Sequence, residues 1–406
     1  MTTNLSPDIL YGYGDPAVLR LEAAQAGDPH DWYYVFCTSN DAPDAFPILR
    51  SRDLQNWEPR GFIFPRGAEP PWASVGENVA DFWAPEVHLV DGEFRAYFVA
   101  RDRSARSELC IGVARARHPE GPYSAEPEPL LTGDKIDPHV YVQSAGRSYL
   151  YWKEDKNGIW PNLLNEFIYT HPSRITRLFE NRQDRVTASF LSALWPWIRE
   201  LQPMERFFVQ HALIQSINSD FAAFEQRLSG CAHQDADPEV QHQCRTILRN
   251  LKTTIYVQPL SSDGVSLTGD KEKVLENDQG WEAHVVEGMW VTSIGDRYYM
   301  FYAGNDFSTV EYGIGAAVSD SPLGPFEKPT GAFLQSTAEW LAPGHPSVFV
   351  DRNGKATMFL HAYLPGSVGY KQFRALLCIG LNFDTGAKVK ATRLAAPIDL
   401  QFDRKV

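Results

Sequence analysis

Residues 285–306 read VVEGMWVTSIGDRYYMFYAGND, and the rest of the chain repeats the pattern of this stretch. A carboxylate, Glu287, lies near its start and precedes an alternating segment. The pair Gly295 and Asp296 then separates that segment from the aromatic residues 298–302. Alternation on both sides of a two-residue turn is typical of an antiparallel hairpin with one buried face. The stretch therefore predicts two strands joined by a tight turn.

Four other stretches repeat this pattern. They begin near Gly14, Trp83, Ile136 and Pro343, and read GDPAVLR with DWYYVFCTSN, WAPEVHLVDGEFRAYFVARD, IDPHVYVQSAGRSYLYWKED and PGHPSVFVDRNGKATMFLHAY. Each has a Pro or Gly at the entrance of a strand, a turn at Gly or Asp, and a second strand rich in aromatic residues. In four of the copies, further strands and a polar turn follow. Five units of four strands predict an all-β fold, a five-bladed β-propeller.

The third unit is interrupted. After YLYWKEDKNG the next strand is due within a few residues, but TTIYVQPLSSDGVSLTG begins only at Thr253. Residues 159–252 contain few Gly and carry apolar residues at intervals of three and four, which favours helices. We therefore divide the chain into blades one, two and part of three (1–158), a helical insertion within the third blade (159–252), and the rest of blade three with blades four and five (253–406).

The ends of the inserted helices are marked by capping residues. Pro203 begins a helix that Gly230 ends as a C-cap, while Asp237 and Pro238 cap and start the last one. Three roles remain open for the insertion. It pads the outside of the propeller, it forms a surface through which two copies of the chain associate, or it lies as a lid over the central cavity.

Composition limits the classes of function. The chain has 406 residues, 43% of them hydrophobic, and a formal net charge of −13 without a basic cluster, which argues against a nucleic-acid partner. No apolar run reaches membrane-spanning length, and no secretory signal is visible, so we expect a cytoplasmic protein. Neither a phosphate-binding Gly-rich loop nor zinc-ligand spacing occurs, so no nucleotide or redox cofactor is expected.

Three blade entrances carry acids. Asp15 and Asp137 each precede a Pro, and Glu287 precedes a Gly. The inner strands of a propeller converge on its axis, so residues at the entrances face one shared cavity although they are far apart in sequence. A single Asp-Pro is only a turn signal. Three carboxylates at equivalent repeat positions indicate a function, because acids brought together without compensation are costly.

These residues resemble a known family. The ordered series YGYGDPAVLR, FWAPEVHLVDG, IDPHVYVQSAGRSYLYWKED, LSSDGVSLTG, WEAHVVEG, YYMFYAGND, SPLGPF and PGHPSVF is similar to glycoside hydrolase family 43, over the whole chain except the insertion. The resemblance implies a propeller that hydrolyses glycosidic bonds of arabinose- or xylose-containing saccharides with inversion at the anomeric carbon. Met289 stands where a Pro often occurs, and Pro346 follows the histidine of PGHPSVF. Both departures touch the pocket walls, so they put the substrate in doubt more than the activity.

The resemblance also implies roles for the three acids. Asp15 matches the general base that activates water, Glu287 matches the general acid that protonates the leaving oxygen, and Asp137 matches a third carboxylate that orients the acid and tunes its protonation. The chemistry independently requires this division of labour. An inverting glycosidase needs one ionised and one protonated carboxyl, roughly 6.5–9.5 Å apart, so that water and sugar fit between them.

Four further residues are candidates for binding. As a flat apolar ring, Trp83 suits a sugar-subsite wall, although a lone Trp more often packs in a core. His284 reaches the sugar or supports the acid. Arg374 matches a family arginine that pairs with a catalytic acid or a sugar hydroxyl, with an exposed strand edge as the alternative. His345 matches a family histidine beside a calcium or other cation held mostly by water, with a core histidine as the alternative.

The sequence therefore predicts an inverting glycosidase, with an exo-acting α-L-arabinofuranosidase as the main expectation and a β-xylosidase or another furanosidase as the near alternative. The alternative from another class is a carbohydrate-binding propeller without catalysis. Retention of all three acids favours the enzyme, because binding alone needs no matched acid and base. The expected partner is an arabinose- or xylose-containing oligosaccharide, and a homo-oligomer through the insertion is a further expectation.

Overall fold

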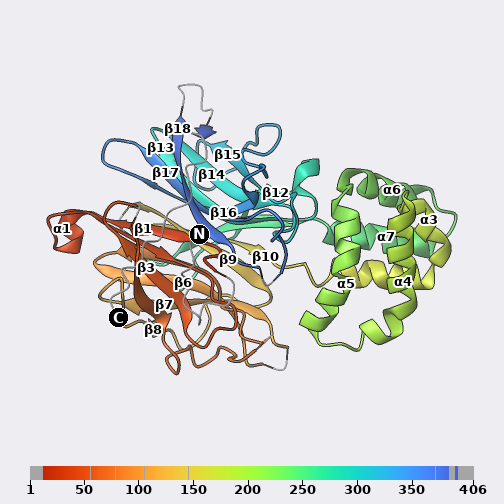
Figure 1. Cartoon of the computed structure of the whole chain (residues 1–406), viewed down its shortest axis with the longest axis horizontal. Coiled ribbons are helices and arrows are strands. Elements are labelled where there is room, and N and C mark those ends of the chain that lie inside the picture. Colours follow the sequence, from red (N-terminus) through yellow and green to blue (C-terminus); the bar gives the residue numbers. More distant parts are fainter. Residues whose placement is uncertain are drawn as a thin grey trace.

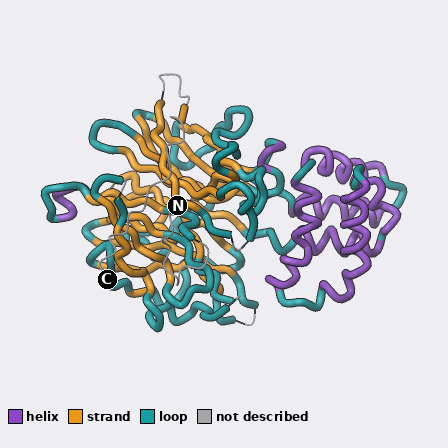
Figure 2. The backbone as a smooth tube through the Cα atoms, in the orientation of Figure 1, coloured by secondary structure: helices purple, strands orange, loops and turns teal. Residues whose placement is uncertain are grey.

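The computed structural model describes residues 12–54, 56–77, 79–104, 106–144, 146–370 and 372–383, together with the backbone alone of 203–204 and 389–391. Figure 1 and Figure 2 show a body of strands beside a separate group of helices. In the described part of the chain the strands pair into five antiparallel sheets, each built from consecutive strands. The part outside the helices is therefore an all-β structure of small antiparallel sheets.

The sheets are numbered in chain order. The first sheet contains β1 (Ala17–Leu21), β2 (Trp32–Phe36), β3 (Ala45–Ser51) and β4 (Glu58–Phe64). The second contains β5 (Trp83–Val90), β6 (Glu93–Arg101), β7 (Leu109–Ala116) and β8 (Ser124–Ala125). The third contains β9 (Lys135–Ser144), β10 (Arg147–Glu154), β11 (Thr254–Leu260) and β12 (Glu272–Glu276). The fourth contains β13 (Val286–Ile294), β14 (Arg297–Gly304) and β15 (Gly313–Ser319), and the fifth β16 (Leu341–Val350), β17 (Ala356–Tyr363), β18 (Ala375–Phe383) and β19 (Val389–Ala391).

The first strands of the five sheets contact one another in a closed order. β1 contacts β5, β5 contacts β9, β9 contacts β13, β13 contacts β16, and β16 contacts β1 again. Each first strand therefore has a neighbour from another sheet on both sides. This arrangement brings the entrances of all five first strands to one place.

The hairpin predicted at residues 285–306 is confirmed. β13 and β14 pair up to Ile294 and Arg297, which leaves a two-residue turn with Gly295 in the left-handed region at φ 59°. Glycine adopts this conformation without steric cost. Met300 and Phe301 of β14 are fully buried, because aromatic and branched side chains from neighbouring sheets pack between the layers.

The fourth sheet departs from the predicted four strands. Its described part has three strands, and the following segment makes only isolated bridges, Val318 with Glu327 and Ile314 with Leu334. Pro325 and Pro329 lie in this segment, and a proline has no N–H to donate to a ladder. A regular fourth strand is therefore not formed here.

The described α-helices other than the short α1 (Ala23–Ala26) lie between β10 and β11, two strands that pair with each other. We call residues 160–250 the helical region. It contains α2 (Trp160–Thr170), the 3-10 helix η1 (Pro172–Arg174), α3 (Ile175–Leu178), α4 (Arg182–Ile198), α5 (Pro203–Asn218), α6 (Phe221–Gln234) and α7 (Pro238–Asn250), and the 3-10 helix η2 (Gly280–Glu282) follows later in the chain. The helices bury a core of their own, with Leu164, Leu191, Ile214, Leu228 and Ile247 among its members.

Two helix ends differ from the prediction. The single helix expected from Pro203 to Gly230 is divided, because α5 ends at Asn218 and Asp220, with φ −149° and ψ 50°, is not helical. Gly230 lies inside α6, which continues to Gln234. A glycine inside a helix costs about 1 kcal/mol relative to alanine, and the packing of α6 against the helical core outweighs that preference. The predicted cap at Asp237 is confirmed, since its side chain accepts from the N–H of Glu239.

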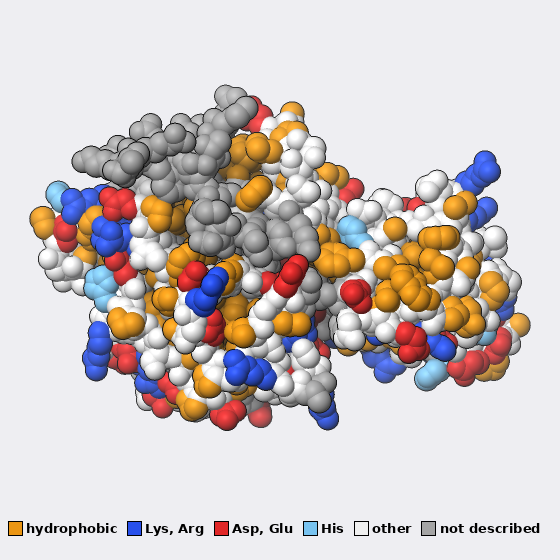
Figure 3. Space-filling model, turned by 60° about the horizontal axis from the view of Figure 1, so that its bottom comes forward, with side chains coloured by type: hydrophobic (Ala, Val, Ile, Leu, Met, Phe, Trp, Pro, Cys, Tyr) orange, Lys and Arg blue, Asp and Glu red, His pale blue; other side chains and the backbone are white. Residues whose placement is uncertain are grey.

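The helical region also exposes apolar side chains. On α4, Val186, Phe190 and Trp197 are 54%, 62% and 54% exposed. Figure 3 shows hydrophobic side chains gathered on this part of the surface. Among the described helices, none combines the length and the apolar character that a membrane span requires.

Candidate active site

The first strand of each sheet has the same irregularity at its entrance. A residue with a left-handed φ recurs there, namely Asp15 (52°), Ala84 (44°), Asp137 (56°), Gly288 (53°) and His345 (50°). In the second to fifth sheets the pairing register shifts at this point, as expected for a bulge. Bulges beside functional sites redirect side chains, so this repeated feature fixes the orientation of the residues at the ring of first strands.

Glu287 is offset from the two aspartates by one residue. Asp15 and Asp137 themselves hold the left-handed position, whereas in the fourth sheet Gly288 holds it and Glu287 precedes it. The predicted equivalence of the three carboxylates was therefore wrong by one residue. The structural equivalent of Glu287 is Trp83, since each is the last residue in register before the bulge. Each bulge contains two consecutive residues, and the repeat pattern of the sequence does not show which residue of an entrance takes the left-handed conformation.

Asp15 is surrounded by hydrogen-bond donors and cations. Its Oδ1 lies 2.8 Å from Arg374 Nη1 and 3.3 Å from His345 Nδ1, and its Oδ2 accepts a 2.6 Å hydrogen bond from the Thr38 hydroxyl. Burial acts to raise the pKa of Asp15, but Arg374, His345, His361 and Thr38 together hold it well below the usual value. Asp15 is therefore ionised at neutral and mildly acidic pH.

The ring of His361 is neutral and accepts from the backbone. The N–H of Asp15 donates to His361 Nδ1 at 3.1 Å, so the proton of this ring is on Nε2. Burial, with Arg374 as the next contribution, lowers the pKa of His361 well below its usual value. The ring thus fixes the backbone of Asp15 in its left-handed conformation.

Both carboxylate oxygens of Glu287 have partners. Tyr312 donates its hydroxyl to Oε1 at 3.0 Å, and Lys153 Nζ lies 3.0 Å from Oε2. The Lys153 side chain is fully buried and has Asp155 as a second carboxylate at 3.9 Å. Burial acts to lower the pKa of Lys153, but the carboxylates of Glu287, Asp155 and Asp137 together raise it. Lys153 is therefore a buried ammonium that orients Glu287.

Asp137 has the opposite surroundings to Asp15. Its Oδ2 accepts a 2.8 Å hydrogen bond from the Gly288 N–H. Burial raises the pKa of Asp137 to about 6, with His345 opposing the shift and the charge of Glu287 adding to it. Asp137 can therefore hold a proton close to neutral pH.

Shared neighbours join the three acids into one cluster. His345 contacts Asp15, and a Cβ atom added to Gly288 would lie 2.8 Å from His345 Nδ1, so this ring also lies against the residue after Glu287. The side chains of Asp15 and Glu287 remain 14% and 13% exposed. A substrate or a water molecule can therefore reach both carboxylates.

The other predicted residues lie at different distances from this cluster. Arg374 is buried against Asp15 and is not an exposed strand-edge residue. Trp83 is half-buried and donates from Nε1 to Asn40 Oδ1 at 3.0 Å, beside the bulge of the second sheet. His284 is buried and faces the helical region, where its Nδ1 lies 3.1 Å from Asn218 Oδ1. Burial lowers the pKa of His284 to about 4, so this ring is neutral.

Sequence reasoning missed four residues of the cluster. Lys153 in YLYWKED and His361 in FLHAY are ionisable residues within otherwise apolar buried strands, and this contrast is a signal that could have found them. Thr38 and Tyr312 lie just outside strands and carry no such signal. Their contribution depends on contacts between different sheets.

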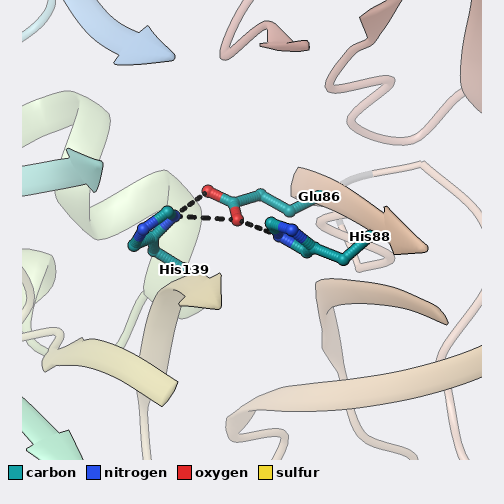
Figure 4. A group of neighbouring side chains, drawn as sticks. All are labelled: Glu86, His88 and His139. Carbon is teal, nitrogen blue, oxygen red and sulfur yellow. Dashed lines mark hydrogen bonds and ion pairs between the residues drawn. The ribbon is translucent and has the colours of Figure 1, made fainter. Parts of the chain in front are cut away.

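A second buried group lies close by, between β5 and β9. Glu86, His88 and His139 present ligand atoms within 4.8 Å of one another, and Figure 4 shows the carboxylate of Glu86 between the two rings. Nδ1 of His139 lies 3.0 Å from both oxygens of Glu86, and Nε2 of His88 lies 2.9 Å from Oε2. In composition, this group has the residue types of a metal site.

The hydrogen bonds of His139 argue against a metal ion there. The N–H of Val291 donates to His139 Nε2 at 2.8 Å, so the ring proton is on Nδ1 and is donated to Glu86. A protonated Nδ1 has no lone pair for a metal. Although burial acts to raise the pKa of Glu86, His139 and His88 lower it to about 2, so Glu86 is a carboxylate. The group therefore links β5, β9 and β13, the strands that carry Trp83, Asp137 and Glu287.

Comparisons with known proteins agree with this geometry. A family model described as glycosyl hydrolases family 43 matches residues 13–179 and 240–385. A xylosidase/arabinosidase of Bacteroides ovatus is 24% identical over 92% of this chain and 93% of that protein. Xylosidase/arabinosidase 43A of Humicola insolens is 38% identical over a shorter stretch, 22% of this chain and 24% of that protein.

Solved structures show the same fold. A thermostable family-43 glycoside hydrolase superposes with a TM-score of 0.64 at 23% identity, covering 98% of this chain and 97% of the other. An α-L-arabinanase of Cellvibrio cellulosa, complexed with arabinohexaose, superposes with a TM-score of 0.54 at 15% identity, covering 94% and 95%. At these identities the likeness extends to the fold and no further.

Proposed function

Because the chain belongs to glycosyl hydrolases family 43, we propose that it is an inverting, exo-acting α-L-arabinofuranosidase that acts on arabinose-containing oligosaccharides. Membership makes the chain a glycosidase, and the sugar it releases is our proposal. The proposal includes the architecture: the five sheets are the blades of a propeller, and the helical region is inserted in the third blade. The ring of contacts among the five first strands supports this assignment.

The observation that carries the proposal is the contrast between the surroundings of Asp15 and those of Asp137. Asp15 is held ionised by Arg374 and Thr38, which suits a base that removes a proton from water. Asp137, with its pKa raised to about 6, lies against the residue next to Glu287. We assign the general acid to Glu287, which gives a proton to the leaving oxygen, and assign Asp137 as the carboxyl that orients it.

In this mechanism the remaining residues position the acids. Lys153 and Tyr312 fix both oxygens of Glu287, so the acid has one orientation toward the substrate. Trp83 forms a wall of the sugar site, and Arg374 turns Asp15 toward the water. His284, three residues before Glu287 on the chain, anchors this segment to α5 through Asn218.

A hydrated calcium ion beside His345 is part of the proposal. Nδ1 of this ring faces Asp15, so only Nε2 remains for a water molecule of the ion's shell. Calcium prefers oxygen ligands, so water and not the ring would coordinate it. Dialysis against a chelator tests this directly: we expect activity to fall severalfold and to return with Ca2+ but not with Mg2+.

A β-xylosidase is the second candidate. The relatives from Bacteroides ovatus and Humicola insolens are both named xylosidase/arabinosidase, and a relative from Xylanibacter ruminicola at 22% identity is named β-xylosidase. Arabinofuranose and xylopyranose both present three hydroxyls and no charge to the acids. The three-carboxyl arrangement accordingly serves either sugar.

The test measures release of 4-nitrophenol from the α-L-arabinofuranoside and the β-D-xyloside by the wild type and by Glu287→Gln. We expect the arabinofuranoside to be the better substrate and Glu287→Gln to lower kcat at least a hundredfold, the usual contribution of a general acid being about 10²–10⁴-fold. NMR of the first-formed sugar should show the inverted anomer. If the wild type hydrolyses neither glycoside but still binds the oligosaccharide, the chain is a carbohydrate-binding propeller.

A further inference from the structure

Five rings gather where the helical region meets the sheets. Tyr370, in the loop between β17 and β18, lies at the centre. Phe207, Phe208 and His211 of α5 and Phe307 of the β14–β15 loop present their rings edge-on to it, with centroids 4.8 to 5.4 Å away. We call these five residues the aromatic cluster. Edge-to-face pairs at this distance are favourable, so the cluster fixes the ring of Tyr370 from several sides.

Two polar contacts hold α5 against the sheets. Ser308 donates its hydroxyl to Asp306 Oδ1 at 2.6 Å, so the 2.7 Å contact between His211 Nε2 and Ser308 Oγ has the histidine as the donor. Further along the helix, Asn218 contacts His284 at 3.1 Å. Positions 211 and 218 are about two helical turns apart and lie on the same face of α5. This face is therefore anchored to the loops that border the active site.

The aromatic cluster begins next to the catalytic acids. The guanidinium carbon of Arg374 lies 5.7 Å from the ring centroid of Phe307, and the same guanidinium holds Asp15 at 2.8 Å. Burial raises the pKa of Tyr370 well above its usual value, with the charge of Glu287 contributing. Both acids of the proposed mechanism are therefore close to the cluster.

The cluster is not sealed off from solvent. Phe208 is 36% exposed, and Phe207, Phe307 and Tyr370 are only partly buried. An aromatic ring beside a glycosidase site offers a flat apolar surface to the C–H face of a sugar, while the hydroxyls at the sugar's edge remain in water. In Figure 1, α5 lies on the side of the helical region that faces the strands. Of the five rings, that of Phe208 is the most open to solvent or to a substrate.

The α5 part of the cluster lies outside the residues that the family model matches. The family model matches residues 13–179 and 240–385, so α5 lies in the stretch that it leaves unmatched. We propose that the aromatic cluster binds the sugar unit on the leaving-group side of the cleaved bond, and that Phe207 and Phe208 of α5 form part of that subsite. This inference rests on the proposed function and adds to it a preference for oligosaccharides whose leaving group is itself a sugar.

The experiment compares two substrates that differ only in the leaving group. One is a trisaccharide of the sugar that the wild type releases, and the other is the fluoride of the same sugar, whose leaving group is too small to reach the cluster. The readout is kcat/KM for the trisaccharide divided by kcat/KM for the fluoride. We expect this ratio to fall about tenfold in Tyr370→Ala and about threefold in Phe208→Ala. The cause should be a higher KM for the trisaccharide, with little change in its kcat. Tyr370→Phe, which keeps the ring, should retain most of the ratio.

The matched control is Phe190→Ala, which removes an equally large but 62% exposed ring from α4. Its ratio should equal that of the wild type. If Tyr370→Ala and Phe208→Ala lower kcat/KM for both substrates by the same factor, the cluster only braces the loops and the inference is wrong. If the wild type hydrolyses neither substrate, the proposed function itself fails, and that result is distinct because it needs no variant.

Discussion

Asp15 and Asp137 occupy the same position in two different sheets but have opposite surroundings. Each precedes a proline, and each has a left-handed φ of 52° or 56° at the entrance of a first strand. Asp15 contacts Arg374, His345 and the Thr38 hydroxyl, and its pKa is well below the usual value. Asp137 accepts from one backbone N–H, and burial raises its pKa to about 6.

The difference comes from the neighbours and not from the motif. The fifth sheet supplies Arg374 and His345 to Asp15, whereas the fourth sheet brings a second carboxylate, Glu287, toward Asp137. A repeated backbone position thus holds two carboxyl groups of opposite character, one with a lowered pKa and one with a raised pKa. Four predictions test this contrast.

The largest effect is expected for Asp15→Asn. Removing the base should lower kcat by about a thousandfold, within the 10²–10⁴ range of general-base catalysis. The variant should also be less stable at pH 7 by about 3 kcal/mol, because Arg374 is left buried without its partner. A carboxyl whose pKa is lowered in the folded protein stabilises the fold at pH values above its unfolded pKa of about 3.9, and this stabilisation is lost as the pH falls further. The loss of stability in Asp15→Asn should therefore be measurable at pH 7. Kinetics and thermal unfolding measure both effects, and a variant that retains a tenth of kcat would contradict the role of Asp15 as base.

Asp137→Asn should show the opposite effect on stability. In the wild type, the buried carboxyl of Asp137 binds a proton more tightly in the folded state than in the unfolded state. Its ionisation therefore destabilises the fold as pH rises from about 4 through about 6. Asparagine removes this penalty and can still accept from the Gly288 N–H. At pH 7.5 the variant should therefore unfold at a higher temperature than the wild type. The gain in the free energy of unfolding should be at most about 3 kcal/mol, which corresponds to a pKa shift of roughly two units, and there should be no gain at pH 4.

Activity provides the second readout for Asp137→Asn. We expect kcat to fall about a hundredfold, because the carboxyl that orients the general acid Glu287 is lost. A variant that is less stable than the wild type at pH 7.5 would show that the native protein stabilises the carboxylate of Asp137, so that its pKa is not raised. The contrast with Asp15 would then be absent.

The sequence predicts which strands and turns carry the residues of this site, but not the contacts that set their charges. Alternation around Gly295 predicted the hairpin of the fourth sheet, and the Asp-Pro pairs predicted where Asp15 and Asp137 lie on their strands. Both features are local, because they depend on the period of a strand and on the conformation of one turn. Contacts between sheets are not local, so neither Lys153 against Glu287 nor the N–H of Gly288 against Asp137 could be read from spacing.

The errors have the same origin. Glu287 was aligned with the aspartates although Gly288 takes their backbone position, because a bulge inserts residues without a mark in the sequence. Gly230 was taken as the end of a helix, but packing in the helical core carries α6 past it. Tertiary contacts decided each case against a local preference.

Arg374→Met should have an intermediate effect. Losing the guanidinium removes the largest favourable charge beside Asp15, so the pKa of that carboxyl should rise by at least about one unit. The acid limb of the profile of kcat/KM against pH should move to higher pH by the same amount, while the alkaline limb stays in place. Arg374→Lys is the control, because it keeps a charge and should move the limb less. An unmoved limb in Arg374→Met would mean that protonation of Asp15 does not limit the reaction.

The smallest effect is expected for Thr38, which joins Asp15 to the second sheet. Its hydroxyl donates to Asp15 Oδ2 at 2.6 Å and accepts from the N–H of Ala84 at 2.8 Å. Thr38→Val removes one of the contacts that lower the pKa of Asp15, so the acid limb should move by less than in Arg374→Met. The free energy of unfolding should fall by about 1–3 kcal/mol, because the buried N–H of Ala84 loses its acceptor. Thr38→Ser keeps the hydroxyl and should restore both properties. If valine leaves the acid limb unchanged while stability falls, the Thr38 hydroxyl serves the backbone of the second sheet alone, and the ionisation of Asp15 rests on the charges of the fifth sheet.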